Sequence, residues 1–392
     1  EIDPDVIISV HPLVQELTLE VLKYWEEERH FMSIPFITVV TDYGSAHPTW
    51  FHPSVSACYI PSEPIREIAL EQGLNEDQVK LFGLPVRAPF WQESRSISEI
   101  RTSLKIKTNL STVLLVGGGD GVGGLGEVAG AVADALAASK MKPLVQVVII
   151  CGKNKVLADA LRVRRFGVSV FIMDFVDNMH EWMRASDIII TKAGPGTIAE
   201  ALICGLPIIL SSFLPGQEEG NVRFVVNNEL GAYSDQPEEI SQIVCGWLAD
   251  PESLAAMRNR VKQFGRPRAT QEIARDAWSV AMQKLDERDK QRTRLAAARE
   301  RLVEEKRERR QALVATSNNI DMVCSNNPLG SCMYPFREYD EELDEPPTCL
   351  LFSRMMILFR QSIQALLQHP FHPMVDSVDR DSSRGQQRIR TE

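Results

Sequence analysis

The hydrophobic pattern of the first ninety residues alternates between two periods. Short runs of apolar and β-branched residues predict buried strands, and apolar residues spaced three or four apart predict helices between them. Strands that alternate with helices indicate a parallel sheet covered by helices. The predicted strands are Val6–Val10, Phe36–Val40, Ala57–Ile60 and Val79–Phe82, and the predicted helices cover 12–29, with Leu13, Leu17, Val21 and Leu22 on one face, and 65–72.

A second alternating series begins near residue 111. Its helices are predicted at 127–139, 153–165, 178–184, 221–228 and 270–282, and its strands at 113–116, 145–151, 168–171, 188–191 and 207–211. Residues 91–110 are polar and rich in Ser, Thr and Lys, which predicts a linker. We therefore expect two α/β lobes, residues 1–90 and 111–283, that are joined by a linker at 91–110.

The composition shifts after residue 283. Residues 284–310 hold eleven Lys or Arg and seven Asp or Glu with few large apolar residues, which predicts a solvated helix or a disordered charged segment. Residues 350–367 could form an amphipathic helix that lies on an anionic membrane or packs on a lobe. The last twenty-odd residues have a disordered composition. We expect 284–392 to be a charged, partly disordered extension.

The overall composition narrows the class of protein. A chain of 392 residues is long enough for two domains, and a net charge of −10 argues against broad nucleic-acid binding. Seven scattered cysteines without a Cys-x-x-Cys pair suggest reduced thiols. No apolar run reaches the length of a membrane span, and no signal peptide is evident. Because the chain begins with Glu1, we expect its natural N-terminus to lie upstream.

One strand–turn–helix segment carries the most informative chemistry. The buried strand Ile188–Thr191 leads into a turn at Gly194–Thr197, and a helix is predicted from Ile198 with Thr197 as its cap. The free amides and the dipole of a helix N-terminus bind anions. Glu200, one turn into the helix, could accept hydrogen bonds from a ribose diol. The segment therefore predicts a nucleoside diphosphate site.

Two further loops follow strands of the same lobe. Gly117–Gly126 lacks the Gly-Lys-Ser/Thr of a nucleotide-triphosphate loop, and no acidic residue ends the next strand, so a dinucleotide site is disfavoured. A plain tight turn is the alternative. Because ligands bind at the carboxyl ends of strands in open α/β sheets, both glycine turns are expected at one site. Gln217, Glu218 and Asn221 could then bind sugar hydroxyls, or form an ordinary surface loop.

The loop His47–His52 combines imidazoles and aromatic rings. His47 has a suitable pKa to take a proton from a hydroxyl nucleophile. Trp50 and Phe51 could touch a lipid or a sugar face, and a structural turn with packed aromatics is the alternative. Asp-x-Asp pairs, which could hold a metal with a nucleotide sugar, occur only near the chain ends. We therefore expect no metal, and the diphosphate charge would be met by helix dipoles and by Lys192 or Arg87.

Several blocks between about residues 5 and 282 resemble glycosyltransferase family 28, and most closely its monogalactosyldiacylglycerol synthases. Their number, order and spacing argue against chance similarity. The blocks are Thr41-Asp42 with His47–Phe51, Gly83–Arg87, Gly117–Gly121, Ile150–Asn154, Phe175–Met179, Thr191–Gly205 and Pro215–Val222.

The resemblance implies a GT-B fold, in which two Rossmann-like lobes enclose a cleft. It implies an inverting hexosyltransferase that moves galactose from UDP-galactose to the sn-3 hydroxyl of 1,2-diacylglycerol, without a bound cofactor. Carried over by residue, it places Gly194, Gly196 and Thr197 with Lys192 at the diphosphate, Glu200 at the ribose, Gln217, Glu218 and Asn221 at the sugar, Gly118 and Gly119 along the cleft, and His47, Trp50, Phe51 and Arg87 on the acceptor side.

The same resemblance locates the catalytic base and the site of action. The family's base is a His in a glycine-rich loop that would lie upstream of Glu1, so His47 is only a substitute candidate. A peripheral protein of the plastid (chloroplast) envelope is implied, with membrane lipid as partner, no nucleic acid and a possible homodimer. The open alternatives are a family 28 transferase for another UDP-sugar or lipid, a UDP-sugar epimerase, and a non-catalytic protein that binds UDP-sugar or membrane.

Overall fold

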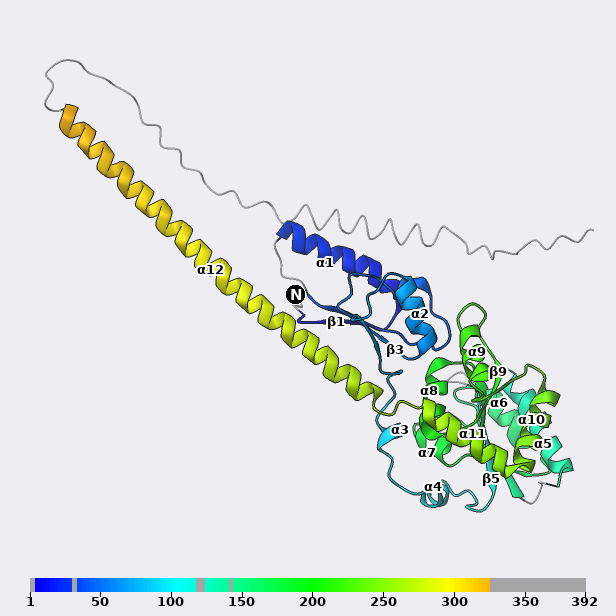
Figure 1. The fold of residues 1–392 in the computed structure, drawn as a ribbon. Coiled ribbons are helices and arrows are strands. Elements are labelled where there is room, and N and C mark those ends of the chain that lie inside the picture. The colour runs from blue at the N-terminus through cyan, green and yellow to red at the C-terminus, as the bar shows by residue number, and fades with distance from the viewer. Residues whose placement is uncertain (1–3, 30–33, 118–123, 141–143, 325–392) are drawn as a thin grey trace, which may run out of the picture. The chain divides into compact units, whose positions relative to one another are not determined.

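Two parallel β-sheets dominate the computed structural model, which describes residues 4–29, 34–117, 124–140 and 144–324 (Figure 1). The chain divides into a compact unit of residues 1–309 and a second unit of residues 310–392. Both sheets belong to the first unit. No helix within the described ranges is long and apolar enough to cross a membrane.

The first sheet has four parallel strands in the order β1-β2-β3-β4. Every predicted strand is found, with ends that shift by one residue at most, because the buried β-branched runs define them. Helices and short 3-10 turns connect the strands. The bounds are β1 Ile7–Ser9, η1 Pro12–Val14, α1 Gln15–Arg29, β2 Phe36–Val39, η2 Pro48–Trp50, β3 Ala57–Ile60, α2 Glu63–Glu71 and β4 Val79–Leu81.

The predicted apolar face of the first helix is only partly confirmed, because Leu22 packs against the core but Leu13 and Leu17 do not. Leu13 and Leu17 are 72% and 48% exposed, whereas Gln15 and Leu19 are buried. The segment opens with the 3-10 turn η1, whose three residues per turn shift the phase of the helix that follows. Buried Gln15 is satisfied: its amide donates to the carbonyl of Trp50 at 2.7 Å and its oxygen accepts from the Thr38 hydroxyl at 2.5 Å.

The second sheet has six parallel strands in the order β10-β9-β8-β5-β6-β7. From β5 the chain continues to β6 on one side, and β8 lies on the other, so the sheet switches direction between β5 and β8. Ligands bind beyond the carboxyl ends of strands at such a switch point. The strands are β5 Ser111–Val116, β6 Val145–Ile150, β7 Ser169–Met173, β8 Ile188–Lys192, β9 Ile208–Ser212 and β10 Gly231–Tyr233.

Helices cover both faces of the second sheet through two apolar clusters. The pattern predicted no element between residues 229 and 269, where the structure has β10 and two helices. The helices of this sheet are α5 Leu125–Ala138, α6 Lys155–Val163, α7 Met179–Arg184, α8 Pro195–Cys204, α9 Glu219–Asn227, α10 Pro237–Ala249 and α11 Pro251–Phe264.

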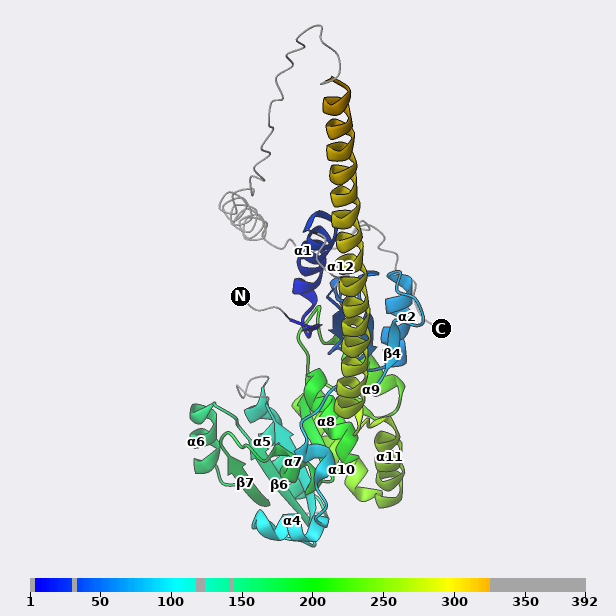
Figure 2. The same cartoon turned by 90° about the vertical axis from the view of Figure 1, so that its left-hand side faces the viewer.

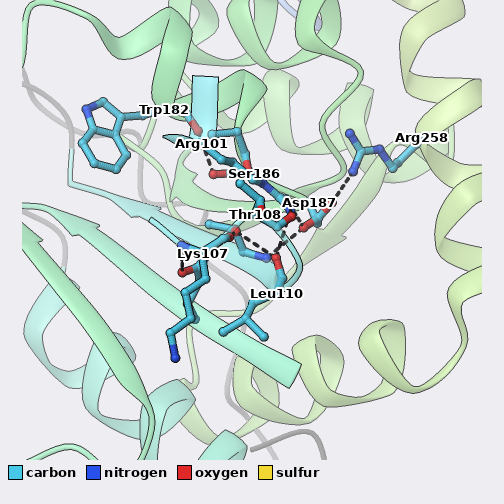
Figure 3. Close-up of polar contacts among 11 residues, drawn as sticks. Arg101, Lys107, Thr108, Leu110, Trp182, Ser186, Asp187 and Arg258 are labelled. Atoms are coloured by element: carbon cyan, nitrogen blue, oxygen red, sulfur yellow. Dashed lines mark hydrogen bonds and ion pairs between the residues drawn. The ribbon is translucent and has the colours of Figure 1, made fainter. Parts of the chain in front are cut away.

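Residues 91–110 join the two sheets, but part of this predicted polar linker is folded onto the second sheet. It contains the end of α3 (Pro89–Gln92) and all of α4 (Ile97–Ser103), which begins with a capping box at Ser96. Ile100 and Ile106 are buried in the core beside the second sheet. Arg101 is buried too, and Figure 3 shows its guanidinium turned toward Asp187 and nearby backbone carbonyls.

The helix that was expected to close the second lobe at 270–282 packs against the first sheet instead. It is the start of α12 (Ala269–Cys324), and its Ile273 and Ala277 join a cluster with residues of β2 and β3. Asp276 reinforces this contact, because it pairs with Lys80 at 2.7 Å and accepts from the Tyr59 hydroxyl at 2.7 Å. Local sequence predicted the helix but carried no information about which sheet it would cover.

The charged segment after residue 283 is helical, so the solvated helix is the correct alternative. All side chains from Asp289 to Arg309 are exposed, and the helix continues to Cys324 (Figure 2). An exposed helix with interspersed opposite charges is supported by ion pairs three and four residues apart. The amphipathic stretch 350–367 lies outside the described residues.

Candidate active site

The N-terminus of α8 lies at the switch point of the second sheet. The helix begins at Pro195 with Gly194 as its N-cap, so Thr197 lies within the first turn and its predicted role as cap is wrong. Proline is favoured at the first helical position, because its fixed φ suits the helix and its missing amide would have no partner there. Within the described residues, the amides of Gly196 and Thr197 have no hydrogen-bond partner. Two open amides at a helix N-terminus form an anion site.

Lys192 supplies a cation beside this helix end. Its ammonium pairs with Oε1 of Glu218 at 2.7 Å, and the Glu218 side chain is only 9% exposed. The other oxygen of Glu218 accepts from the Leu214 amide at 2.9 Å. Glu218 therefore holds Lys192 next to Gly194. The neighbouring residue Gln217 is exposed.

Asn221 was expected to contact the sugar, but the structure uses its whole side-chain amide internally. Oδ1 accepts from the amides of Tyr43 at 3.0 Å and Gly44 at 3.3 Å, and Nδ2 donates to the carbonyl of Ala193 at 3.0 Å. Its side chain is fully buried. Asn221 therefore fastens the loop after β2 to the second lobe, and its contact with the sugar stays a prediction.

Two glycines allow that loop to approach so closely. A Cβ at Gly44 would overlap the carbonyl of Gly220, and a Cβ at Gly220 would overlap Ser45. The ring of Tyr43 packs on that of Phe224 with centroids 4.9 Å apart. We call residues 42–45 together with 218–221 the β2–α9 junction. Only glycine fits where two backbones meet at this distance.

Asp42 belongs to the junction and was not a predicted site residue. Its Oδ2 accepts from the indole N–H of Trp50 at 2.9 Å. Burial raises the pKa of Asp42, the Trp50 hydrogen bond opposes this shift, and the negative charge of Glu218 raises the pKa further. A carboxylate directly after the strand end at β2 was the available sequence signal.

The aromatic residues of the His47–His52 loop belong to the core. Trp50 and Phe51 are 2% and 7% exposed and pack in the cluster behind the first sheet. This burial is what the packed structural turn predicts, and the contact of the two residues with an acceptor stays a prediction. His47 is exposed, and its Nδ1 caps η2 by accepting from the Thr49 amide at 3.3 Å.

Glu200 and Arg87 form a second charged pair at α8. Nη2 of Arg87 lies 3.8 Å from Oε1 of Glu200, and the guanidinium also lies over the Phe90 ring. Burial raises the pKa of Glu200 to about 7, and Arg87 acts against that shift. Arg87 was assigned to the acceptor side, but the structure places it beside the predicted ribose ligand. Gly118 and Gly119 lie outside the described residues.

One group of side chains could offer three metal ligands within the described residues. Atoms of Glu93, His180 and Glu181 lie within 4.8 Å of one another. Arg95 pairs with both carboxylates of the group. The cluster therefore already has a cation, and we assign it no metal.

Comparison with known proteins identifies the family of the two lobes. Residues 1–86 match the family described as monogalactosyldiacylglycerol (MGDG) synthase, and residues 112–273 match the glycosyltransferase family 28 C-terminal domain. Monogalactosyldiacylglycerol synthase 3, chloroplastic, from Arabidopsis thaliana is 44% identical over 285 residues, which are 72% of this chain and 61% of that protein. Synthase 2 from the same plant is 42% identical over 299 residues, 76% of this chain and 62% of that protein.

The fold has a counterpart among solved structures. The crystal structure of Acinetobacter baumannii MurG superimposes with a TM-score of 0.51 at 17% identity, covering 70% of this chain and 73% of that one. The chain spans about three fifths of the length of the two Arabidopsis relatives. With both family regions matched in order on two parallel α/β sheets, the chain belongs to the monogalactosyldiacylglycerol synthases of glycosyltransferase family 28, which have the GT-B fold.

Proposed function

We propose that the protein is an inverting hexosyltransferase that moves galactose from UDP-galactose to the sn-3 hydroxyl of 1,2-diacylglycerol. The observation that carries this proposal is the open N-terminus of α8, flanked by Lys192 and Glu200, in a chain of this family. A diphosphate needs amide donors and positive charge, and both occur there.

The donor would lie along α8. The amides of Gly196 and Thr197 would bind the diphosphate, and the Lys192 ammonium would offset its charge. Glu200, one turn further along, would accept hydrogen bonds from the ribose hydroxyls. Gln217 is exposed beside this region, and together with Glu218 and Asn221 it is a candidate to bind the sugar itself.

Transfer would proceed by a single displacement. The acceptor oxygen forms a bond to C1 of the sugar, the bond from C1 to the diphosphate oxygen breaks, and the bonding pair leaves with UDP. The amides and Lys192 at α8 would stabilise the charge that develops on the leaving group. No metal is needed in this scheme, because the helix end and the lysine supply the positive potential.

We propose further that the protein acts at the surface of the plastid envelope, where its lipid acceptor would lie. The names of the Arabidopsis relatives describe them as chloroplastic. Fractionation of plastids followed by a salt or alkaline wash would test peripheral attachment, and sedimentation would test the homodimer expected from the family resemblance.

Radiolabelled UDP-galactose and diacylglycerol vesicles test the activity of the natural full-length protein. We expect a galactolipid with inverted anomeric configuration, and competition with UDP-glucose and UDP-N-acetylglucosamine should be weak. Lys192→Ala should lower activity strongly, whereas Lys107→Ala, which changes an exposed lysine before β5, should not. Absence of galactolipid, or preference for another donor or acceptor, would contradict the proposal.

A further inference from the structure

Two chain segments pass between the first and the second sheet, and they contact each other. The first segment, residues 83–86, follows β4, and the second, residues 266–270, leads from α11 into α12. Gly83 has a φ of +103°, and a Cβ there would lie 2.5 Å from the Cβ of Arg266. Only glycine accepts both this φ and this close approach. The two segments therefore pack against each other as they pass between the lobes.

The side chain of Thr270, the second residue of α12, ties these segments together. Its hydroxyl accepts from the Val86 amide at 2.9 Å and donates to the Val86 carbonyl at 2.8 Å. Val86 is buried in the core beside the second sheet. Ile273, three residues after Thr270, is buried against the first sheet. Thr270 therefore fixes a backbone position of the second lobe to a helix that covers the first sheet.

The backbone that Thr270 holds leads directly into Arg87. Nη2 of Arg87 lies 3.8 Å from Oε1 of Glu200, and its guanidinium lies 5.7 Å from the centre of the Phe90 ring. The segment is held at its other end too, because Arg184 donates to the Phe90 carbonyl at 3.0 Å. The Arg87 side chain is 66% exposed, so its many rotamers leave the backbone to decide where its charge can lie. This clamped backbone places the guanidinium within reach of Glu200.

We propose that Thr270 is a positioning residue that holds Arg87 beside Glu200 in the donor site. It acts through the backbone of Val86 and touches no substrate itself. The inference rests on the proposed function, in which Glu200 meets the ribose. It makes the charge beside the nucleotide depend on how α12 lies on the first lobe, because a movement of Thr270 would carry Arg87 with it.

Thr270→Val is the central test, because valine resembles threonine in shape but forms neither hydrogen bond to Val86. With Arg87 less well placed, Glu200 should ionise at a higher pH. In the natural full-length protein, UDP affinity near pH 7 should fall about two- to fivefold, the range of an exposed ion pair. It should approach that of the unaltered protein at pH 9, where Glu200 is ionised in both. Calorimetric titration with UDP measures these affinities.

The surroundings of Glu200 make it the group whose charge changes near neutrality. Burial raises the pKa of the Cys204 thiol to about 12 and lowers the pKa of His180 from its ordinary value. The phosphate of UDP titrates identically in every comparison. The groups that act on Glu200 or on its direct neighbours come from α7, α8, α11 and the segment between the sheets, and they are His180, Arg184, Cys204, Arg258 and Arg87.

Four further variants distinguish positioning from a general loss of structure. Thr270→Ser keeps the hydroxyl and should restore the unaltered pH profile, whereas Thr270→Ala should shift it as Thr270→Val does. In an Arg87→Ala background, Thr270→Val should change UDP affinity less than about twofold at any pH, because its effect passes through Arg87. Thr293→Val is the matched control in the same helix. The Thr293 hydroxyl bonds only the carbonyl of Asp289 within α12, so this variant should bind UDP normally.

The outcomes separate this inference from the proposed function. If the unaltered protein binds no UDP, both fail. If it binds UDP and makes galactolipid while Thr270→Val and Thr270→Ala keep the unaltered pH profile, Thr270 is not a positioning residue and the proposed function stands. Equal weakening at every pH, or an undiminished effect in the Arg87→Ala background, would show a merely structural role and would overturn the inference.

Discussion

Nη2 of Arg87 lies 3.8 Å from Oε1 of Glu200 on α8. Arg87 belongs to the chain segment between the two sheets, and its positive charge favours the ionised form of this carboxyl. Burial raises the pKa of Glu200 to about 7, and Arg87 lowers it. The ionised form of Glu200 is the better acceptor for ribose hydroxyls. Near neutrality, therefore, the strength of the proposed nucleotide contact depends on a cation from outside the donor lobe.

UDP affinity should rise with pH through about 7 and then level off, because Glu200 is protonated below that pH and ionised above it. Arg87→Ala removes the charge that lowers the Glu200 pKa, so the rise should move to higher pH. Calorimetric titration with UDP from pH 6 to pH 9 measures the pH dependence of UDP affinity in the unaltered protein and in Arg87→Ala. Glu200→Gln should abolish the pH dependence, and Glu200→Ala should weaken binding by about 1–3 kcal/mol. A pH-independent affinity in the unaltered protein would exclude Glu200 from the ribose contact.

Asp187→Ala should destabilise the protein by about 3 kcal/mol, because it leaves the buried Arg101 charge unpaired. Asp187 pairs with Arg101 at 2.8 Å and Arg258 at 2.6 Å, and accepts from the Thr112 amide at 2.8 Å (Figure 3). Denaturant unfolding measures the loss. Arg258→Ala should cost about 1 kcal/mol or less, since this arginine is more exposed. If Asp187→Ala and Arg258→Ala lowered the free energy of unfolding equally, the ion pair between Asp187 and Arg101 would not be the larger contribution to stability.

Asn221→Ala should both destabilise the protein and reduce transfer, because three buried backbone groups lose their partner. An unsatisfied buried polar group costs about 1–3 kcal/mol. Thermal unfolding and the galactosyl-transfer assay measure the two effects. Asn227→Ala, at an exposed asparagine at the end of the same helix, is the matched control and should change neither. If Asn221 acted only on the sugar, stability would be unaffected.

Gly44→Ala should separate the two sides of the β2–α9 junction, since a methyl group there overlaps the Gly220 backbone. Backbone cannot yield as a flexible side chain does, so we expect lower stability and a fall in kcat with little change in UDP affinity. Gly246→Ala is the contrasting control: it lies exposed in α10 with nothing near its Cβ, and should stabilise by about 0.5–1 kcal/mol. Unchanged kcat in Gly44→Ala would contradict a catalytic need for the junction.

The local sequence was sufficient for every described strand except β10, for most described helices and for the turn before α8. Buried β-branched runs specify strands wherever they occur, and Gly194 with Pro195 specifies a helix start within a residue or two. The same local reasoning misplaced part of the buried face of α1, because the phase of a helix depends on the turn before it. It also treated Trp50 and Phe51 as available aromatics, since burial depends on residues distant in the chain.

Only the tertiary structure decided which side chains meet across the two sheets. Asn221 and Gly44 are far apart in the sequence, and neither pattern nor composition relates them. The start of α12 covers the first sheet because its Ile273 and Ala277 fit that sheet's apolar face. By itself, the sequence determined two α/β lobes, their family and the glycine-proline start of α8, because these depend on local periodicity and local turn chemistry. The placing of Arg87 beside Glu200 required the fold, because Coulomb interaction depends on distance in space.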